Sequence, residues 1–208
     1  AAELLASAQG VGGRLTAEFA LRAALMRMES GESGAIEEAR RAVRGMQDPV
    51  RLAELLEERV CWRDLGLARS VIDRLTQLAG PAATPVRINE ARYLLESPMA
   101  EGTSREEVAG AALRLIEEAL RDAPEDPRLM AAKGDILVRE FGSGSRETRA
   151  EGIRQMQRAF ERDPANIRLA LRLLPLLHEQ QSWDAARQIL DRVRAFRSRD
   201  PQVAVQLS

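Results

Sequence analysis

The chain has 208 residues, of which 45% are apolar and 30% charged, and its formal net charge at pH 7 is −1. This balance excludes a disordered chain, and the small net charge argues against broad binding to nucleic acid or to an anionic membrane. One Cys and one His exclude an internal disulfide framework and any multi-Cys or multi-His metal site. We therefore predict neither a metal nor another cofactor.

Helix caps and proline residues divide the chain into ten predicted helices. Asp48-Pro49, Thr84-Pro85, Asp126-Pro127 and Asp200-Pro201 each place a capping side chain before a proline that suits the first helical position. Ser104 to Glu107 is typical of a capping box, and Ser145 and Ser182 are further candidate caps. Apolar residues recur between these points at helical spacing. The predicted helices cover 14–29, 34–46, 49–62, 64–79, 85–97, 104–122, 126–140, 146–162, 165–180 and 183–198. No convincing two-residue alternation separates them, so we expect no sheet.

The predicted helices form similar pairs, which indicates a repeat. The paired units start near residues 16, 49, 85, 127 and 167, and a period of this size is the signature of a helical solenoid. The unit at 167 shows the pattern best, with Leu173, Trp183 and Leu190 among its apolar positions. Ala68, Ala112, Gly152 and Ala186 are small residues that would let the two helices of a pair approach closely. Larger neighbours would then fill the space between pairs.

This pattern resembles the tetratricopeptide (TPR) repeat, a helix-turn-helix unit of about 34 residues. The units at 127 and 167 match it well, and those at 16 and 85 match it least. The resemblance implies an all-α fold, a right-handed superhelix of about five helix pairs, as a single repeat domain over residues 1–208. Another α-solenoid or an irregular helical bundle is the alternative fold.

The resemblance also implies a non-catalytic scaffold that binds a protein or a peptide in its concave groove. The family's groove positions fall on Asn89, Tyr93 and Glu96 in the third unit, on Arg128, Asp135 and Arg139 in the fourth, and on Arg168, Leu171, His178 and Glu179 in the fifth. These residues mix both charges with apolar contacts. The Lys and Asn set of the family's carboxylate clamp is missing. The alternative function is a structural or assembly segment of a larger bacterial secretion or polysaccharide-export machine.

Individual reactive residues do not suggest an enzyme. His178 is the only imidazole, and its neighbour Glu179 would point to a different side of the helix, so a general base would lack its acidic partner. Cys61 has no nearby His or second Cys and is best explained as a buried structural thiol. We therefore predict no catalytic residues.

Two features of the last predicted helices bear on the groove. Pro175 lies inside a helical pattern, where it removes a hydrogen bond and clashes with the preceding turn, so we expect a kink near 171–174 or a break in the helix. Arg154, Arg158 and Arg162 recur every four residues on a trailing helix and are flanked by acids. We interpret this row as a solvated convex face, with phosphate or acidic-peptide binding as the alternative.

The ends of the chain suggest that it is part of something longer. It begins with Ala rather than Met, so we expect that an N-terminal segment has been removed. After Asp200-Pro201, apolar residues predict either a fragment of a longer array or a short C-terminal capping helix. No stretch is apolar over the length that a membrane-spanning helix needs. Both cytoplasm and periplasm are compatible with these features, and no oligomeric state is predicted.

Overall fold

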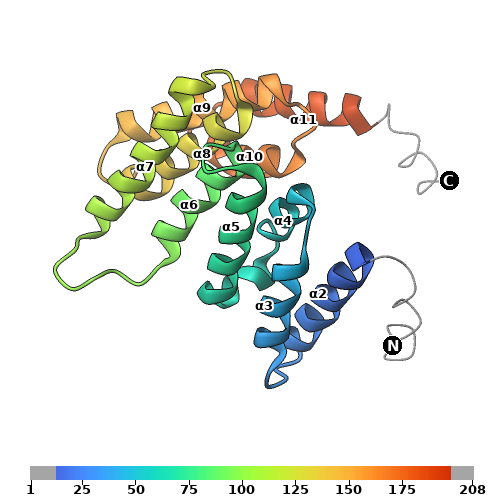
Figure 1. Ribbon diagram of the computed structural model, residues 1–208. Helices are drawn as coiled ribbons and strands as arrows, with labels where there is room; N and C mark the ends of the chain where they lie inside the picture. Colours follow the sequence, from blue (N-terminus) through green and yellow to red (C-terminus); the bar gives the residue numbers. More distant parts are fainter. Residues whose placement is uncertain (1–12, 198–208) are drawn as a thin grey trace. The chain divides into compact units, whose positions relative to one another are not determined.

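The computed structural model describes residues 13–197, and within this range the chain is helical with no β-strand (Figure 1). The prediction of an all-α fold is confirmed. The elements are α2 (Gly13–Glu29), α3 (Ala35–Gly45), α4 (Pro49–Leu55), η2 (Arg59–Arg63), α5 (Leu65–Ala79), α6 (Thr84–Glu96), α7 (Arg105–Asp122), α8 (Pro127–Ile136), η3 (Leu137–Phe141), α9 (Arg146–Arg162), α10 (Ile167–Glu179) and α11 (Trp183–Arg197). None of these helices is both long and apolar enough to cross a lipid bilayer.

Side-chain caps begin several helices where the sequence predicts them. Asp48 accepts hydrogen bonds from two backbone N–H groups of α4, and Asp126 does the same for α8. Ser104 forms the predicted capping box with Glu107, and Ser145 caps α9. The prediction for Thr84 was wrong by one residue, because Ala83 is the N-cap of α6 and Thr84 already belongs to the helix. The predicted cap at 200–201 lies outside the described residues.

The predicted helix 49–62 was wrong, because α4 ends at Leu55 and a 3₁₀ helix, η2, follows it. Glu58 between them is extended, with φ −82° and ψ 132°. The carbonyl of Leu56 accepts hydrogen bonds from the indole of Trp62 at 2.7 Å and from the guanidinium of Arg92 at 3.0 Å. A continuous helix would have needed that carbonyl for the backbone N–H four residues later. The tertiary hydrogen bonds therefore replace the last helical turn.

The predicted helix 126–140 has the expected extent but not a uniform geometry. It is α-helical in α8 and π-helical in η3, from Leu137 to Phe141. A π segment holds more residues in a turn than an α-helix, so the residues beyond Ile136 point in directions that the α-helical period does not predict. Within η3, the carboxylate of Glu140 accepts two hydrogen bonds from the guanidinium of Arg105 at the start of α7, and both N–O distances are 2.8 Å.

The chain forms two compact units, one ending at Glu101 and the other beginning at Gly102. In unit 1, α2 packs on α3, and α5 packs on α3, α4 and α6. In unit 2, α8 packs on α7 and α9, and α10 packs on α9 and α11. The predicted pairs near 16, 49, 127 and 167 thus correspond to the packed pairs α2–α3, α4–α5, α8–α9 and α10–α11. The predicted pair near 85 falls on α6 and α7, which belong to different units. A single repeat domain over residues 1–208 remains a prediction.

Each unit has its own aliphatic core. The largest fully buried side chains are Leu52, Leu56, Leu67, Ile72 and Leu75 in unit 1, and Ile116, Leu129, Ile153, Met156, Phe160, Leu173 and Leu177 in unit 2. Cys61 is also fully buried, which confirms the structural interpretation of this thiol. Burial raises the pKa of the Cys61 thiol to about 12, because a thiolate would lose its hydration there.

Two glycines set the distance between α8 and α9. A Cβ atom added to Gly134 would lie 2.6 Å from the carbonyl oxygen of Gly152 and 2.5 Å from Cγ of Met156. A Cβ atom added to Gly152 would lie 2.8 Å from the carbonyl oxygen of Gly134. The two backbones therefore touch where neither residue has a side chain. This confirms that the small residue at Gly152 permits the close approach of a pair, with Gly134 as its partner.

The proline in α10 does not interrupt the helix, which runs from Ile167 to Glu179 through Pro175. The expected break was therefore wrong. Pro175 and Leu171, one turn earlier, are both exposed. The carbonyl of Leu171, which loses its donor because proline has no N–H, consequently lies on the solvent side of α10. The buried side of the same helix, with Leu169, Leu173 and Leu177, keeps its packing.

Candidate functional site

The groove residues predicted in the fourth unit lie along one side of α8 and η3. Arg128 and Asp135 are seven residues apart and therefore share a face of α8, where Arg128 is exposed and Asp135 is partly exposed. Arg139 follows in η3 and is exposed. The opposite side of α8 carries Leu129 and Met130, which are buried. The helix thus separates a packing side from a side available to a ligand.

The residues predicted in the fifth unit lie on the exposed side of α10. Arg168, Leu171, His178 and Glu179 are all exposed, as is Pro175 among them. Leu171 exposes 64% of its surface, although it is a large apolar residue in a helix whose other leucines are mostly buried. The helical period therefore places all of the predicted fifth-unit residues away from the core of unit 2.

An ion pair joins these two exposed sides. Asp135 of α8 lies 3.4 Å from a guanidinium nitrogen of Arg172 in α10 and 3.6 Å from one of Arg139. Arg172 is a residue that the family positions missed, although its place four residues after Arg168 puts it on the same helix face. We call the resulting surface the α8–α10 face. It consists of Arg128, Asp135, Arg139, Arg168, Leu171, Arg172, Pro175 and Glu179.

The far end of α10 is extended by an aromatic contact with α11. The rings of His178 and Trp183 meet edge to face, with their centroids 4.8 Å apart. Trp183 still exposes 56% of its surface. Glu179 forms an ion pair with Arg149 of α9. The sequence-based prediction did not place Trp183 in the groove. Its position as the first residue of α11, directly after the turn that follows His178, could have indicated this contact.

The residues predicted in the third unit, which belong to unit 1, do not form a comparable surface. Asn89 is only 4% exposed, and its side-chain amide donates a hydrogen bond to the carbonyl of Pro85 at 2.7 Å. The prediction that Asn89 lines a groove is therefore corrected: it is a buried, satisfied polar residue of α6. Tyr93 is half-buried against the core of unit 1. Glu96 is exposed.

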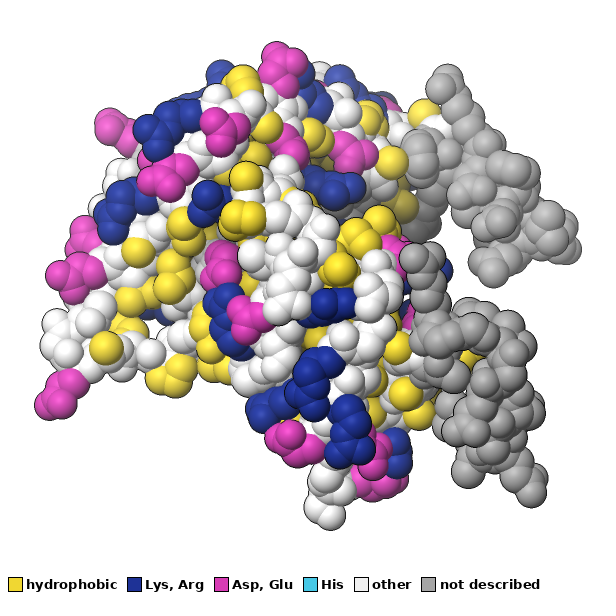
Figure 2. Space-filling model, in the orientation of Figure 1, with side chains coloured by type: hydrophobic (Ala, Val, Ile, Leu, Met, Phe, Trp, Pro, Cys, Tyr) yellow, Lys and Arg dark blue, Asp and Glu magenta, His cyan; other side chains and the backbone are white. Residues whose placement is uncertain are grey.

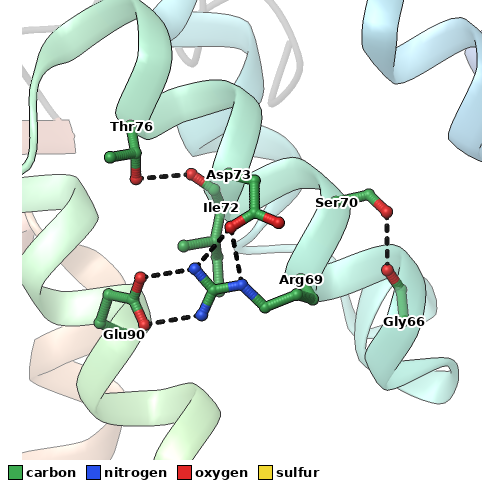
Figure 3. A network of polar contacts seen from close by, with 7 residues as sticks. All are labelled: Gly66, Arg69, Ser70, Ile72, Asp73, Thr76 and Glu90. Atoms are coloured by element: carbon green, nitrogen blue, oxygen red, sulfur yellow. Dashed lines mark hydrogen bonds and ion pairs between the residues drawn. The ribbon is translucent and has the colours of Figure 1, made fainter.

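Tyr93 lies beside a network that joins α5 to α6. Arg69 of α5 reaches both carboxylate oxygens of Glu90 in α6, at 2.7 and 2.9 Å, and also bonds to Asp73 on its own helix (Figure 3). Its guanidinium carbon lies 5.2 Å from the centre of the Tyr93 ring. These carboxylates raise the pKa of Arg69. The network links α5 to α6 within unit 1, so it acts as a clasp between these helices.

A hollow of about 470 Å³ opens between α7 and α8 of unit 2, and sequence reasoning did not predict it. Its lining residues are Arg114, Glu117, Glu118, Leu120, Arg121 and Lys133. Lys133, the only lysine of the chain, lies 2.8 Å from Glu117, and Arg121 lies 3.7 Å from Glu118. Most of the positive charge that lines the hollow is therefore compensated by neighbouring glutamates.

The arginine row of α9 is compensated in the same way. Arg154 pairs with Glu151 at 2.8 Å, and Arg162 forms a two-pronged ion pair with Glu125 at 2.6 and 2.8 Å. Arg158 is exposed and lies within electrostatic range of Glu151. Basic and acidic side chains are interspersed in the same manner over the molecular face shown in Figure 2. The row is thus a solvated helix surface.

Comparison with known proteins found two solved structures that resemble this chain, but no family to which the chain can be assigned. No protein-family model and no curated protein matches the chain. The solved structure "MamA RS-1 ArsTM double mutant" is 23% identical with a TM-score of 0.46, and the match covers 89% of this chain and 97% of that one. "MamA 41-end from Desulfovibrio magneticus RS-1" is also 23% identical with a TM-score of 0.46, over 88% of this chain and 97% of that one.

The described residues offer groups for binding a ligand rather than for holding a metal ion. Among residues 13–197, no group of three or more His, Cys, Asp or Glu side chains is placed to hold a metal ion. The one imidazole contacts an indole ring. The α8–α10 face offers guanidinium groups, one exposed leucine and one exposed proline, which are groups for contacting a ligand.

Proposed function

We propose that the chain is a non-catalytic binding scaffold, and that the α8–α10 face of unit 2 holds a segment of another protein. The observation that carries the proposal is the exposure of Leu171 on a helix from which Arg172 reaches Asp135 of α8. Arginine is enriched at protein interfaces, and an exposed leucine beside several guanidinium groups gives a ligand both an apolar and a charged contact.

The scaffold is held rigid by the opposite sides of the same helices. Leu169, Leu173 and Leu177 anchor α10 in the core of unit 2, while Leu171 and Pro175 remain outside. The ion pair between Arg172 and Asp135 further links α10 to α8. Because these backbones are already ordered, a ligand would not have to order them on binding, which lowers the entropic cost of association.

The test selects peptides that bind the full chain from a displayed library and then maps their contacts by hydrogen exchange and cross-linking. We expect protection in α8 and α10. The variant Leu171→Asp should weaken binding about tenfold or more, which corresponds to a loss of about 1.4 kcal/mol. Val50→Asp is the matched control, because Val50 in unit 1 is 63% exposed against 64% for Leu171.

Contacts confined to the outer side of α9 would refute the proposal for this face. Equal weakening by Val50→Asp and Leu171→Asp would also refute it, since the two substitutions add the same charge to equally exposed apolar positions in different units. Circular dichroism of both variants confirms that the helices remain folded in each.

A further inference from the structure

We infer that the ligand of the α8–α10 face is an acidic protein segment that carries one large apolar side chain. This inference rests on the proposed function and specifies its ligand. Three observations lead to it: the balance of charge on the face, the loose pairing of its arginines, and the position of the exposed apolar residues among them.

The charge of the face is positive, although the chain as a whole has a net charge of −1. Arg128, Arg139 and Arg172 stand against two carboxylates, those of Asp135 and Glu179. Glu179 is engaged by Arg149 of the neighbouring α9, and Asp135 is shared between two arginines. By contrast, the α9 row matches Arg154 and Arg162 with carboxylates of their own. An incoming carboxylate therefore gains more on the α8–α10 face than on α9.

Arg139 and Arg172 also keep donors for a ligand. The distances from Asp135 to Arg172 and Arg139, 3.4 and 3.6 Å, exceed the roughly 2.7–2.9 Å of a charge-assisted hydrogen bond. A guanidinium has five N–H donors in a planar fork that fits a carboxylate. Two such groups on different helices can thus each receive a ligand carboxylate without first giving up a tight hydrogen bond to Asp135.

The apolar contact lies between these charges. Leu171 directly precedes Arg172, and Pro175 follows one helical turn later, with both side chains exposed. Trp183, next to His178, adds a further exposed apolar surface at the end of α10. A ligand whose carboxylates reach the arginines would place its intervening side chains over Leu171 and Pro175. An apolar side chain there would bury area that otherwise faces water.

The experiment measures the binding of short fluorescein-labelled peptides to the full chain by fluorescence anisotropy. The probe is rich in Asp and Glu and has one central Leu. Its comparison peptides replace the acids by Asn and Gln, replace the acids by Lys, or replace the Leu by Ser. We expect the acidic Leu peptide to bind about tenfold or more tightly than each of the three.

Two charge-matched double variants test the location. Arg139→Glu with Arg172→Glu should weaken binding of the acidic peptide about tenfold or more. Arg158→Glu with Arg187→Glu makes the same change of charge on α9 and α11, at positions that are exposed, and should change the affinity less than about twofold. Circular dichroism checks the helical content of both.

The outcomes separate this inference from the proposed function. If the neutral or the Lys peptide binds the α8–α10 face as well as the acidic one, the proposed function stands and the acidic ligand is refuted. Equal weakening by both double variants, or equal binding of a single-stranded oligonucleotide of the same charge, shows unspecific attraction and overturns the inference. If the acidic peptide does not bind while a peptide from the library does, the inference alone fails. If no peptide binds this face, both fail.

Discussion

The contact between Gly134 and Gly152 allows a sharp prediction about the stability of unit 2. In the variant Gly134→Ala, the new methyl group would lie 2.6 Å from the carbonyl oxygen of Gly152 and 3.1 Å from the backbone nitrogen of Met156. Carbon atoms in favourable contact are about 3.5–4.0 Å apart. Because the obstacles are backbone atoms of α9, the strain is relieved only if the two helices move apart.

Two opposing effects determine the size of the change. Overpacking of a well-packed interior costs about 1–3 kcal/mol, whereas Ala is favoured over Gly inside a helix by about 1 kcal/mol. Because the clash is with rigid backbone, the upper part of the overpacking cost applies, about 2–3 kcal/mol. Subtracting the helix preference of about 1 kcal/mol, we expect Gly134→Ala to lower the free energy of unfolding by about 1–2 kcal/mol. For a domain the size of unit 2 this corresponds to a fall in Tm of about 4–16 °C.

The matched control is Gly110→Ala in α7. A Cβ atom there meets only the end of the Arg114 side chain, at 3.5 Å. The helix propensity therefore acts alone, and we expect stabilisation by about 0.5–1 kcal/mol. Urea unfolding followed by circular dichroism at 222 nm measures both variants, and the fluorescence of Trp183 in a Trp62→Phe background reports on unit 2. A Gly134→Ala protein as stable as the Gly110→Ala protein would refute the reasoning.

Three further predictions concern other contacts. Cys61 should react with a thiol reagent at pH 8 only as fast as unit 1 unfolds, because the thiol is fully buried and burial also raises its pKa; rapid reaction of the native protein would contradict this. The Glu107 carboxylate accepts hydrogen bonds from Ser104, and these bonds lower the carboxyl pKa. The contribution of Glu107 to the stability of the protein is therefore present above about pH 4.5 and is lost as the pH falls through the lowered pKa. Urea unfolding should show that Glu107→Gln destabilises the protein at pH 7 but not at pH 2. A double-mutant cycle between Arg69→Met and Glu90→Gln should give a coupling of about 1 kcal/mol, and additive effects would show that the clasp in Figure 3 contributes nothing.

Local signals predicted most of the helices correctly. Asp48 and Asp126 before prolines, and Ser104 three residues before Glu107, satisfy helix N-termini by contacts within a few residues. Such contacts are visible in the order of residues alone. The groove positions that the TPR resemblance implies on α10 also fall on its exposed side, because a repeat fixes which side of each helix packs on its neighbours.

The predictions failed where distant residues decide the conformation. The end of α4 depends on a hydrogen bond to Leu56 from Arg92, which lies 36 residues further along the chain. Asn89 was assigned to a surface because the repeat register was carried over to one of the weakest units, yet its side chain turns back to Pro85 within the same helix. Arg172 was missed because the family positions skip it, although its pairing with Asp135 connects the two helices of the candidate surface.

The π segment η3 changes how this surface can evolve. A surplus residue accommodated in a helix shifts the rotational phase of everything after it, by about 100° for each residue. Loss of Val138, which precedes Arg139, would turn Arg139 by about 100° around the helix axis, while Arg128 would stay on its original side. Deletion of a single codon could therefore change the direction in which Arg139 points, without substituting any residue of the α8–α10 face.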